Sequence, residues 1–139
     1  MFIQEDDYKT LITEDDREVV DQSDDTMREN AEDTAIEIMS GYLRSRYDIV
    51  ACFDGTDAAK RNKALVMFCL DITLYNLHSS LPGRMVPETR ERRRDEAIKW
   101  LEGVQLGKII PDLPIKKDAT GETVSGIIWG SNQKNTNDW

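Results

Sequence analysis

The clearest pattern in the chain is a helical spacing of apolar residues that begins near residue 30. Steps of three and four place these residues on one face of a helix. They are Ala31, Ala35, Ile38, Met39, Tyr42 and Leu43. Thr26 and Glu29 match the capping box, in which a hydroxyl and a carboxylate each bind a free amide at a helix start. The pattern therefore predicts a helix from Thr26 to about Tyr47.

Two more long helices are predicted further along. From Asn62 to Ser79 the sequence is apolar almost all the way round, which is typical of a helix in the middle of a bundle. Pro87 suits the first turn of a helix over 87–106, and Gly107 suits its end. The first half of that helix, ETRERRRDE, is charged, and the second half carries an apolar stripe.

Shorter helices are predicted over residues 4–10 and 14–21. The predicted fold is thus all-α: a small bundle of three long helices preceded by one or two short N-terminal helices. At 139 residues the chain is long enough to bury a core in a single domain.

After Ile110 the helical period is lost, and prolines and glycines become frequent. We therefore predict a helical domain over 1–110 and an extended C-terminal arm over 111–139, with one short strand near 123–129. Ile127, Ile128 and Trp129 form an apolar cluster that favours docking on a partner. The alternative is that the arm folds back and Trp129 covers its own bundle.

The charge is strongly acidic and unevenly distributed. The chain has 27 acidic and 18 basic residues, a net charge of −9, which argues against sequence-specific binding of DNA or RNA. The first 37 residues are the most acidic part, whereas Arg90, Arg92, Arg93 and Arg94 form a basic cluster. We expect this cluster to meet acidic residues of a neighbouring subunit, although a solvated surface is the commoner explanation for such a run.

No pattern for catalysis, a cofactor or a metal emerges. A glycine-rich phosphate loop and the G-x-S-x-G motif are absent, and His78 is the single histidine. Residues 21–32 partly match a calcium loop, but Thr26 stands where that loop needs glycine, so a capped helix start is the better interpretation. Cys52 and Cys69 are expected to be free thiols. We expect a protein that is not an enzyme.

No secretory signal or membrane span is predicted. The N-terminus has neither a basic start nor an apolar core, and the longest apolar run is too short to cross a bilayer. That run also contains Asp71, and a buried carboxylate is costly unless it is paired. We predict that Arg46, or failing that Arg44, binds Asp71. The alternative is a narrow wet stripe that Asp71 shares with Asn76.

Three segments in this order carry a family resemblance: AIEIMSGYLRSRYDI, then LVMFCLDITLYNLHSS, then RRRDEAIKWLEGVQLGKI. Over roughly residues 1–110 they resemble the Mu-like phage family of head–tail connector proteins. That family shows an acidic N-terminal segment and a long helix ending in Tyr-Leu…Arg-Tyr. A buried helix with Asp-Ile…Tyr-x-Leu follows, then a helix with Ala-Ile…Trp-Leu…Gly-Lys. The connection CFDGTDAA lacks the prolines expected there.

The resemblance implies a small all-α adaptor without catalysis or cofactor. It implies a ring, twelve-fold in this family, that lies below the portal protein, joins the capsid to a tail-side neck or terminator protein, and lets DNA pass. It further implies a place in the neck of the virion after synthesis in the host cytoplasm. A second class stays open: an intracellular acidic helical interaction or regulatory module, antitoxin-like or a nucleic-acid mimic.

Overall fold

The computed structural model describes residues 1–10, 14–83 and 85–117. Its elements are six α-helices and one short 3-10 helix: α1 (Glu5–Thr10), α2 (Glu14–Gln22), α3 (Asp25–Leu43), α4 (Ile49–Cys52), η1 (Ala58–Lys60), α5 (Lys63–Ser80) and α6 (Glu88–Gln105). The predicted all-α class is confirmed, and the three long helices and two short N-terminal helices lie within a few residues of their predicted ranges.

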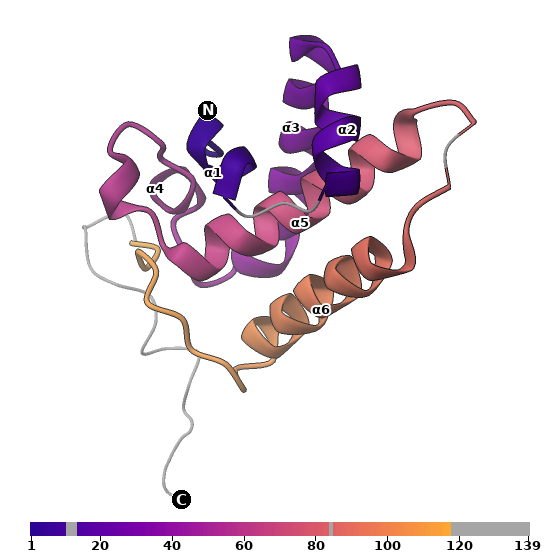
Figure 1. Ribbon diagram of the computed structural model, residues 1–139. Helices are drawn as coiled ribbons and strands as arrows, with labels where there is room; N and C mark the ends of the chain where they lie inside the picture. The colour runs from indigo at the N-terminus through magenta and orange to yellow at the C-terminus, as the bar shows by residue number, and fades with distance from the viewer. Residues whose placement is uncertain (11–13, 84, 118–139) are drawn as a thin grey trace, which may run out of the picture.

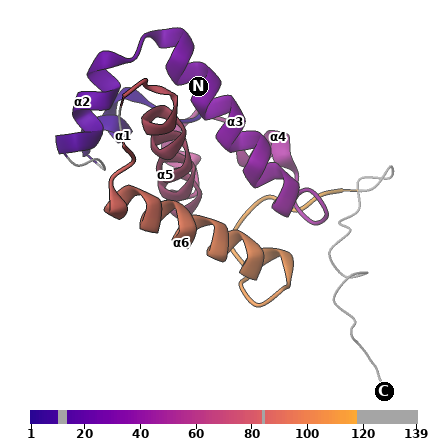
Figure 2. The same ribbon diagram turned by 90° about the vertical axis from the view of Figure 1, so that its right-hand side faces the viewer.

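The core is built around α5, which lies between α3 and α6 (Figures 1 and 2). Its apolar sequence explains this place, because a helix that is apolar on most sides must be covered on most sides. Leu65, Leu74 and Leu77 of α5 are fully buried. Small and medium side chains let the neighbouring helices approach: Ala31, Ala35, Met39 and Leu43 from α3, and Ala97, Leu101 and Val104 from α6.

The start of α3 differs from the predicted capping box. Asp24 is the N-cap residue, and its carboxylate accepts a 2.8 Å hydrogen bond from the amide of Met27. Thr26 already lies inside the helix. The prediction was wrong by two positions because aspartate caps a helix as well as threonine does, and the sequence offers both.

The end of α6 follows the predicted stop. Gly107 adopts a positive φ of 79°, a conformation that glycine reaches without steric penalty. The amide of Lys108 then binds the carbonyl of Gly103 at 2.9 Å, which closes the last turn.

Residues 111–117 lie against the helices. The amide of Asp48 donates to the carbonyl of Pro114 at 2.9 Å, and that of Lys116 donates to Arg46 at 2.9 Å. Tyr47 and Ile115 form an isolated antiparallel bridge, and Leu113 joins the core. Residues just beyond the predicted boundary at residue 110 thus contact the helical part of the chain, through these hydrogen bonds and Leu113. The rest of the arm, with the predicted strand near 123–129, lies outside the described residues.

Candidate functional site

A cluster of four buried polar side chains joins α2, α5 and α6. We call it the Asp16 cluster; its members are Asp16, Asp71, His78 and Arg90. Asp16 lies in the first turn of α2 and Arg90 in the first turn of α6. Asp71 and His78 are seven residues apart on α5, which is two helical turns, so they share one side of that helix.

Arg90 is the centre of this cluster. Its Nη1 donates to Asp71 at 2.6 Å, its Nε donates to Asp16 at 3.1 Å, and its Nη2 forms a further ion pair with Asp16. The side chain of Arg90 is only 2 % exposed. The planar guanidinium has donors in a fixed fork, so one arginine can bridge two carboxylates that belong to different helices.

His78 completes the cluster from the other side of Asp16. Its Nε2 lies 2.9 Å from Asp16 Oδ1, and it is the donor because an ionised carboxylate only accepts. His78 Nδ1 is buried and has no hydrogen-bond partner among the residues that the structure describes. The histidine therefore serves to hold α2 against α5.

The predicted pair of Arg46 and Asp71 is wrong. Asp71 is buried, as a paired carboxylate should be, but its partner is Arg90. Arg46 instead donates to the carbonyl of Val104 near the end of α6, at 2.8 Å. Arg46 was predicted because its helix directly precedes the helix of Asp71 in the chain. In the structure, the first turn of α6 places Arg90 beside Asp71.

Burial raises the pKa of the Asp71 carboxyl, whereas the hydrogen bond and the charge of Arg90 lower it. Arg93 acts in the same direction as Arg90, and the negative charge of Asp16 opposes them.

The four predicted interface arginines differ in exposure: one is buried, one is exposed and two are half-buried. Arg90 belongs to the core and is not available to a neighbouring subunit, so this part of the prediction is wrong. Arg92 is exposed, and Arg93 and Arg94 are half-buried. Arg94 lies over the ring of Tyr75, with its guanidinium carbon 4.9 Å from the ring centroid. Of the four predicted interface arginines, Arg92 is therefore the one whose side chain is most open to solvent.

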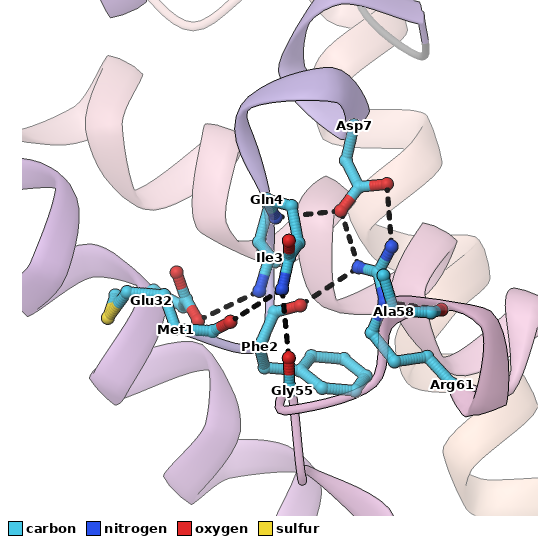
Figure 3. A network of polar contacts seen from close by, with 9 residues as sticks. All are labelled: Met1, Phe2, Ile3, Gln4, Asp7, Glu32, Gly55, Ala58 and Arg61. Atoms are coloured by element: carbon cyan, nitrogen blue, oxygen red, sulfur yellow. Dashed lines mark hydrogen bonds and ion pairs between the residues drawn. The ribbon is translucent and has the colours of Figure 1, made fainter.

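A second polar network holds the first four residues in place (Figure 3). Phe2 and Ile3 are buried, and the backbone amide of Ile3 donates to the Glu32 carboxylate at 3.2 Å. Arg61 donates to the carbonyl of Phe2 at 2.9 Å and to Asp7 at 2.5 Å. The N-terminal segment is thus bound mainly through its backbone, between α3 and the connection that precedes α5.

Gln4 and Gly55 complete this network. The amide group of Gln4 donates to the carbonyls of Met1 and Gly55, at 3.3 and 3.0 Å. A Cβ added to Gly55 would collide with the Met1 carbonyl oxygen and lie 3.0 Å from its carbon. An Asp-Gly pair such as Asp54-Gly55 is typical of a turn, but the reason for glycine here is this close approach of two backbones.

Glu32 was not identified from the sequence, although its place between Ala31 and Ala35 was a signal. On α3 it lies on the side that faces the core and is 2 % exposed. Burial raises the pKa of its carboxyl, and hydrogen bonds from the amides of Ile3 and Phe2 act against that rise. This inward position, together with the helical conformation of residues 25–32, is incompatible with the calcium loop considered above.

Neither cysteine has the environment of a reactive thiol. Both are buried; burial raises the pKa of Cys52 to about 12 and that of Cys69 well above its usual range. In the part of the chain that the structure describes, no group of three or more His, Cys, Asp or Glu side chains is arranged to hold a metal ion. Within the same ranges, no helix has the length and hydropathy of a membrane span.

The predicted docking residues Ile127, Ile128 and Trp129 lie outside the described residues. The structure therefore does not place them.

Comparison with protein families shows where the chain belongs. The family model described as "Bacteriophage Mu, Gp36" matches residues 2–128. The chain belongs to the bacteriophage Mu Gp36 family. The match extends past residue 110, where the resemblance seen in the sequence ended, and includes Ile127 and Ile128. No curated protein and no solved structure matches the chain.

Proposed function

We propose that this member of the Gp36 family is a structural protein of a Mu-like phage particle: a head–tail connector that forms a ring below the portal and joins the capsid to the tail. The observation that carries the proposal is the family match over residues 2–128. The ordered motifs of the three long helices support the finer role, because they resemble connector proteins in particular.

The partners follow from that role. The chain would contact copies of itself in a ring, twelve-fold by resemblance, the portal protein on one side and a neck or terminator protein on the other. DNA would pass without sequence-specific binding, and the protein would reside in the neck of the virion after synthesis in the bacterial host cytoplasm. In this role it has no catalytic activity and no cofactor.

The surface of α3 suits a neighbour of opposite charge or a DNA channel. Four exposed acidic residues follow one another at steps of four, which places them in a row along the helix: Asp25, Glu29, Asp33 and Glu37. Such a row can meet Arg92 to Arg94 of an adjacent subunit, and long-range attraction of this kind steers assembly more than it stabilises it. Facing a channel, it would keep DNA from adhering by repulsion.

The arm adds a second contact in the assembled particle. Ile127, Ile128 and Trp129 would dock on the portal, the tail-side protein or an adjacent subunit. An extended segment can add a strand to the edge of a partner's sheet, where main-chain hydrogen bonds supply affinity.

Deleting the gene from the phage that encodes it tests the proposal. We expect DNA-filled heads and separate tails in electron micrographs, and tailed particles once the gene is restored. Normal tailed particles without the protein would contradict the proposal. Loss of regulation with normal particles would support the acidic regulatory module instead.

The ring contact has its own test, with a matched control. Replacing Arg92, Arg93 and Arg94 by glutamate should prevent complementation and weaken self-association, and the remaining association should fall as salt rises. Replacing exposed Lys60, Lys63 and Lys99 by glutamate changes the net charge by the same amount and should reduce complementation and self-association less. Equal effects of the two triple variants would refute the assignment of the surface.

A further inference from the structure

One end of the bundle exposes an unusual share of apolar surface. Five of the eight large apolar side chains that the described residues leave exposed belong to the elements that meet at this end, namely α4, the first turns of α5 and residues 106–115, and we call this surface the apolar end. They are Val50, Met67, Leu106, Ile110 and Ile115, which are 84, 42, 68, 74 and 37 % exposed. The other three are Met1, Ile38 and Met85.

Hydrogen bonds bring the elements of this end together. The side chain of Asn62, the cap of α5, donates to the carbonyl of Asp112 at 3.1 Å. The bonds of Asp48 and Lys116 described above fix the chain beside α4. The segment that leaves α6 thus crosses the start of α5 and reaches α4, as the orange trace in Figure 1 shows. A gathering of exposed apolar residues of this kind marks a binding surface.

The described chain ends at this same place. Lys117 is its last residue, and nine residues, 118–126, separate it from Ile127. Nine extended residues reach about 30 Å, enough to return across the end of a small bundle. A short tether of this kind gives its own surface an effective concentration of about millimolar, far above that of a second molecule in dilute solution.

The charges of the two parts are complementary. Exposed Lys63, Lys108, Lys116 and Lys117 lie around the apolar end, together with exposed Asp48 and Asp112. Residues 118–139 contain three acidic side chains and one basic one: Asp118, Glu122, Asp138 and Lys134. An apolar surface with more basic than acidic side chains around it thus stands next to an acidic segment that carries three apolar residues.

We propose that in the free subunit Ile127, Ile128 and Trp129 cover the apolar end of their own chain. This contact goes beyond the proposed connector function, since it concerns the subunit before assembly. It does, however, have a consequence for that function: a partner that captures the arm must first compete with the subunit's own surface. The contact would therefore keep residues 127–129 from binding elsewhere until a partner is present.

Disulfide cross-linking of the full chain tests the contact. Cysteines at Lys108→Cys and Gly130→Cys would flank it without removing the apolar side chains. We expect an intramolecular disulfide under mild oxidation, formed about tenfold faster than with Asp33→Cys and Gly130→Cys, because Asp33 lies in the middle of α3. Native Cys52 and Cys69 are buried and should not compete.

A matched variant separates a real contact from the random motion of a tether. Adding Ile128→Ser and Trp129→Ser keeps the same tether and should lower the rate to that of the Asp33 pair. A rate that these changes leave untouched would overturn the proposal. So would a disulfide that forms only between chains when the two single-cysteine variants are mixed, since the occupant would then be a second copy.

An apolar dye gives an independent readout. A chain that ends at Lys117 should bind more of an environment-sensitive dye than the full chain, and Leu106→Ser with Ile110→Ser should abolish the increase. Equal dye binding by the full and shortened chains would contradict the proposal.

Discussion

The bundle of α3, α5 and α6 is held mainly by apolar packing, whereas the N-terminal part of the chain adds buried ion pairs and hydrogen bonds to the apolar packing of Phe2, Ile3 and Val19. The bundle packs alanine, leucine and valine side chains around α5. The N-terminal part is fastened at two places by buried polar groups: the Asp16 cluster at α2, and Glu32 with Arg61 at residues 2–7. Apolar packing tolerates small shifts, whereas a buried charge without its partner is strongly unfavourable. Specific single residues should therefore control the attachment of the N-terminal part.

The largest effect is expected at Arg90. Replacing it by methionine leaves Asp16 and Asp71 buried without their cation, which should lower the free energy of unfolding by about 3–5 kcal/mol. Arg92→Met on the exposed side of the same helix should change it by less than about 0.5 kcal/mol. Denaturant unfolding of both variants measures the difference. Similar losses of unfolding free energy in the two variants would mean that the Asp16 cluster does not stabilise the fold.

Two shortened chains, ending at Ile110 and at Lys117, measure how much residues 111–117 contribute to stability. A chain ending at Ile110 loses Leu113 and the bridge between Tyr47 and Ile115, and we expect a loss of about 2–4 kcal/mol. A chain ending at Lys117 keeps both and should lose less stability, only what the proposed contact of residues 127–129 contributes. If both shortened chains are equally stable, residues 111–117 do not belong to the domain.

Alanine substitutions at two glycines compare a position in the N-terminal polar network with a position on the surface of α3. Gly55→Ala should displace the backbone at Met1 and destabilise the protein by about 1–3 kcal/mol, because the obstructing atoms are main-chain atoms. Gly41→Ala, with nothing within 4 Å of the added carbon, should stabilise α3 by about 0.5–1 kcal/mol. Thermal unfolding reports both, and a neutral Gly55→Ala would show that the N-terminal segment is loosely held.

The smallest effect is the pH dependence contributed by Glu32. Its pKa in the folded protein is raised, so the folded state binds its proton more tightly than the unfolded state does. The stability of the protein relative to the Glu32→Gln variant should therefore fall as pH rises from about 4.3, the usual value for glutamate, through the raised pKa. Asp33→Asn, on the exposed side of α3, is the control. A relative stability that rises over this range would contradict the assignment.

The comparison also explains what the sequence could predict. Helical periodicity is a local property of the sequence. The sequence therefore predicted five of the six α-helices, and their ends were wrong by no more than a few residues. The need of Asp71 for a cation was predictable from its apolar surroundings. The identity of that cation depended on how the helices pack, and the sequence does not encode packing angles locally.

Other parts of the site left weaker signals. Glu32 occupies a core position of the α3 pattern, which is a sign of a buried carboxylate with a partner. Its partners, however, are backbone amides of residues 2 and 3, and any residue supplies a backbone amide. The short α4 was missed because four residues show no period.

Native-state hydrogen exchange tests the central claim most directly, since it reports the opening of each helix separately. Arg90→Met should reduce the protection of α2 amides much more than that of amides in the middle of α5. Leu74→Ala, a change in the core of α5, should reduce both together. Equal loss of protection in α2 and α5 on replacing Arg90 would contradict the account, because the Asp16 cluster would then support the whole bundle and not the attachment of its N-terminal part.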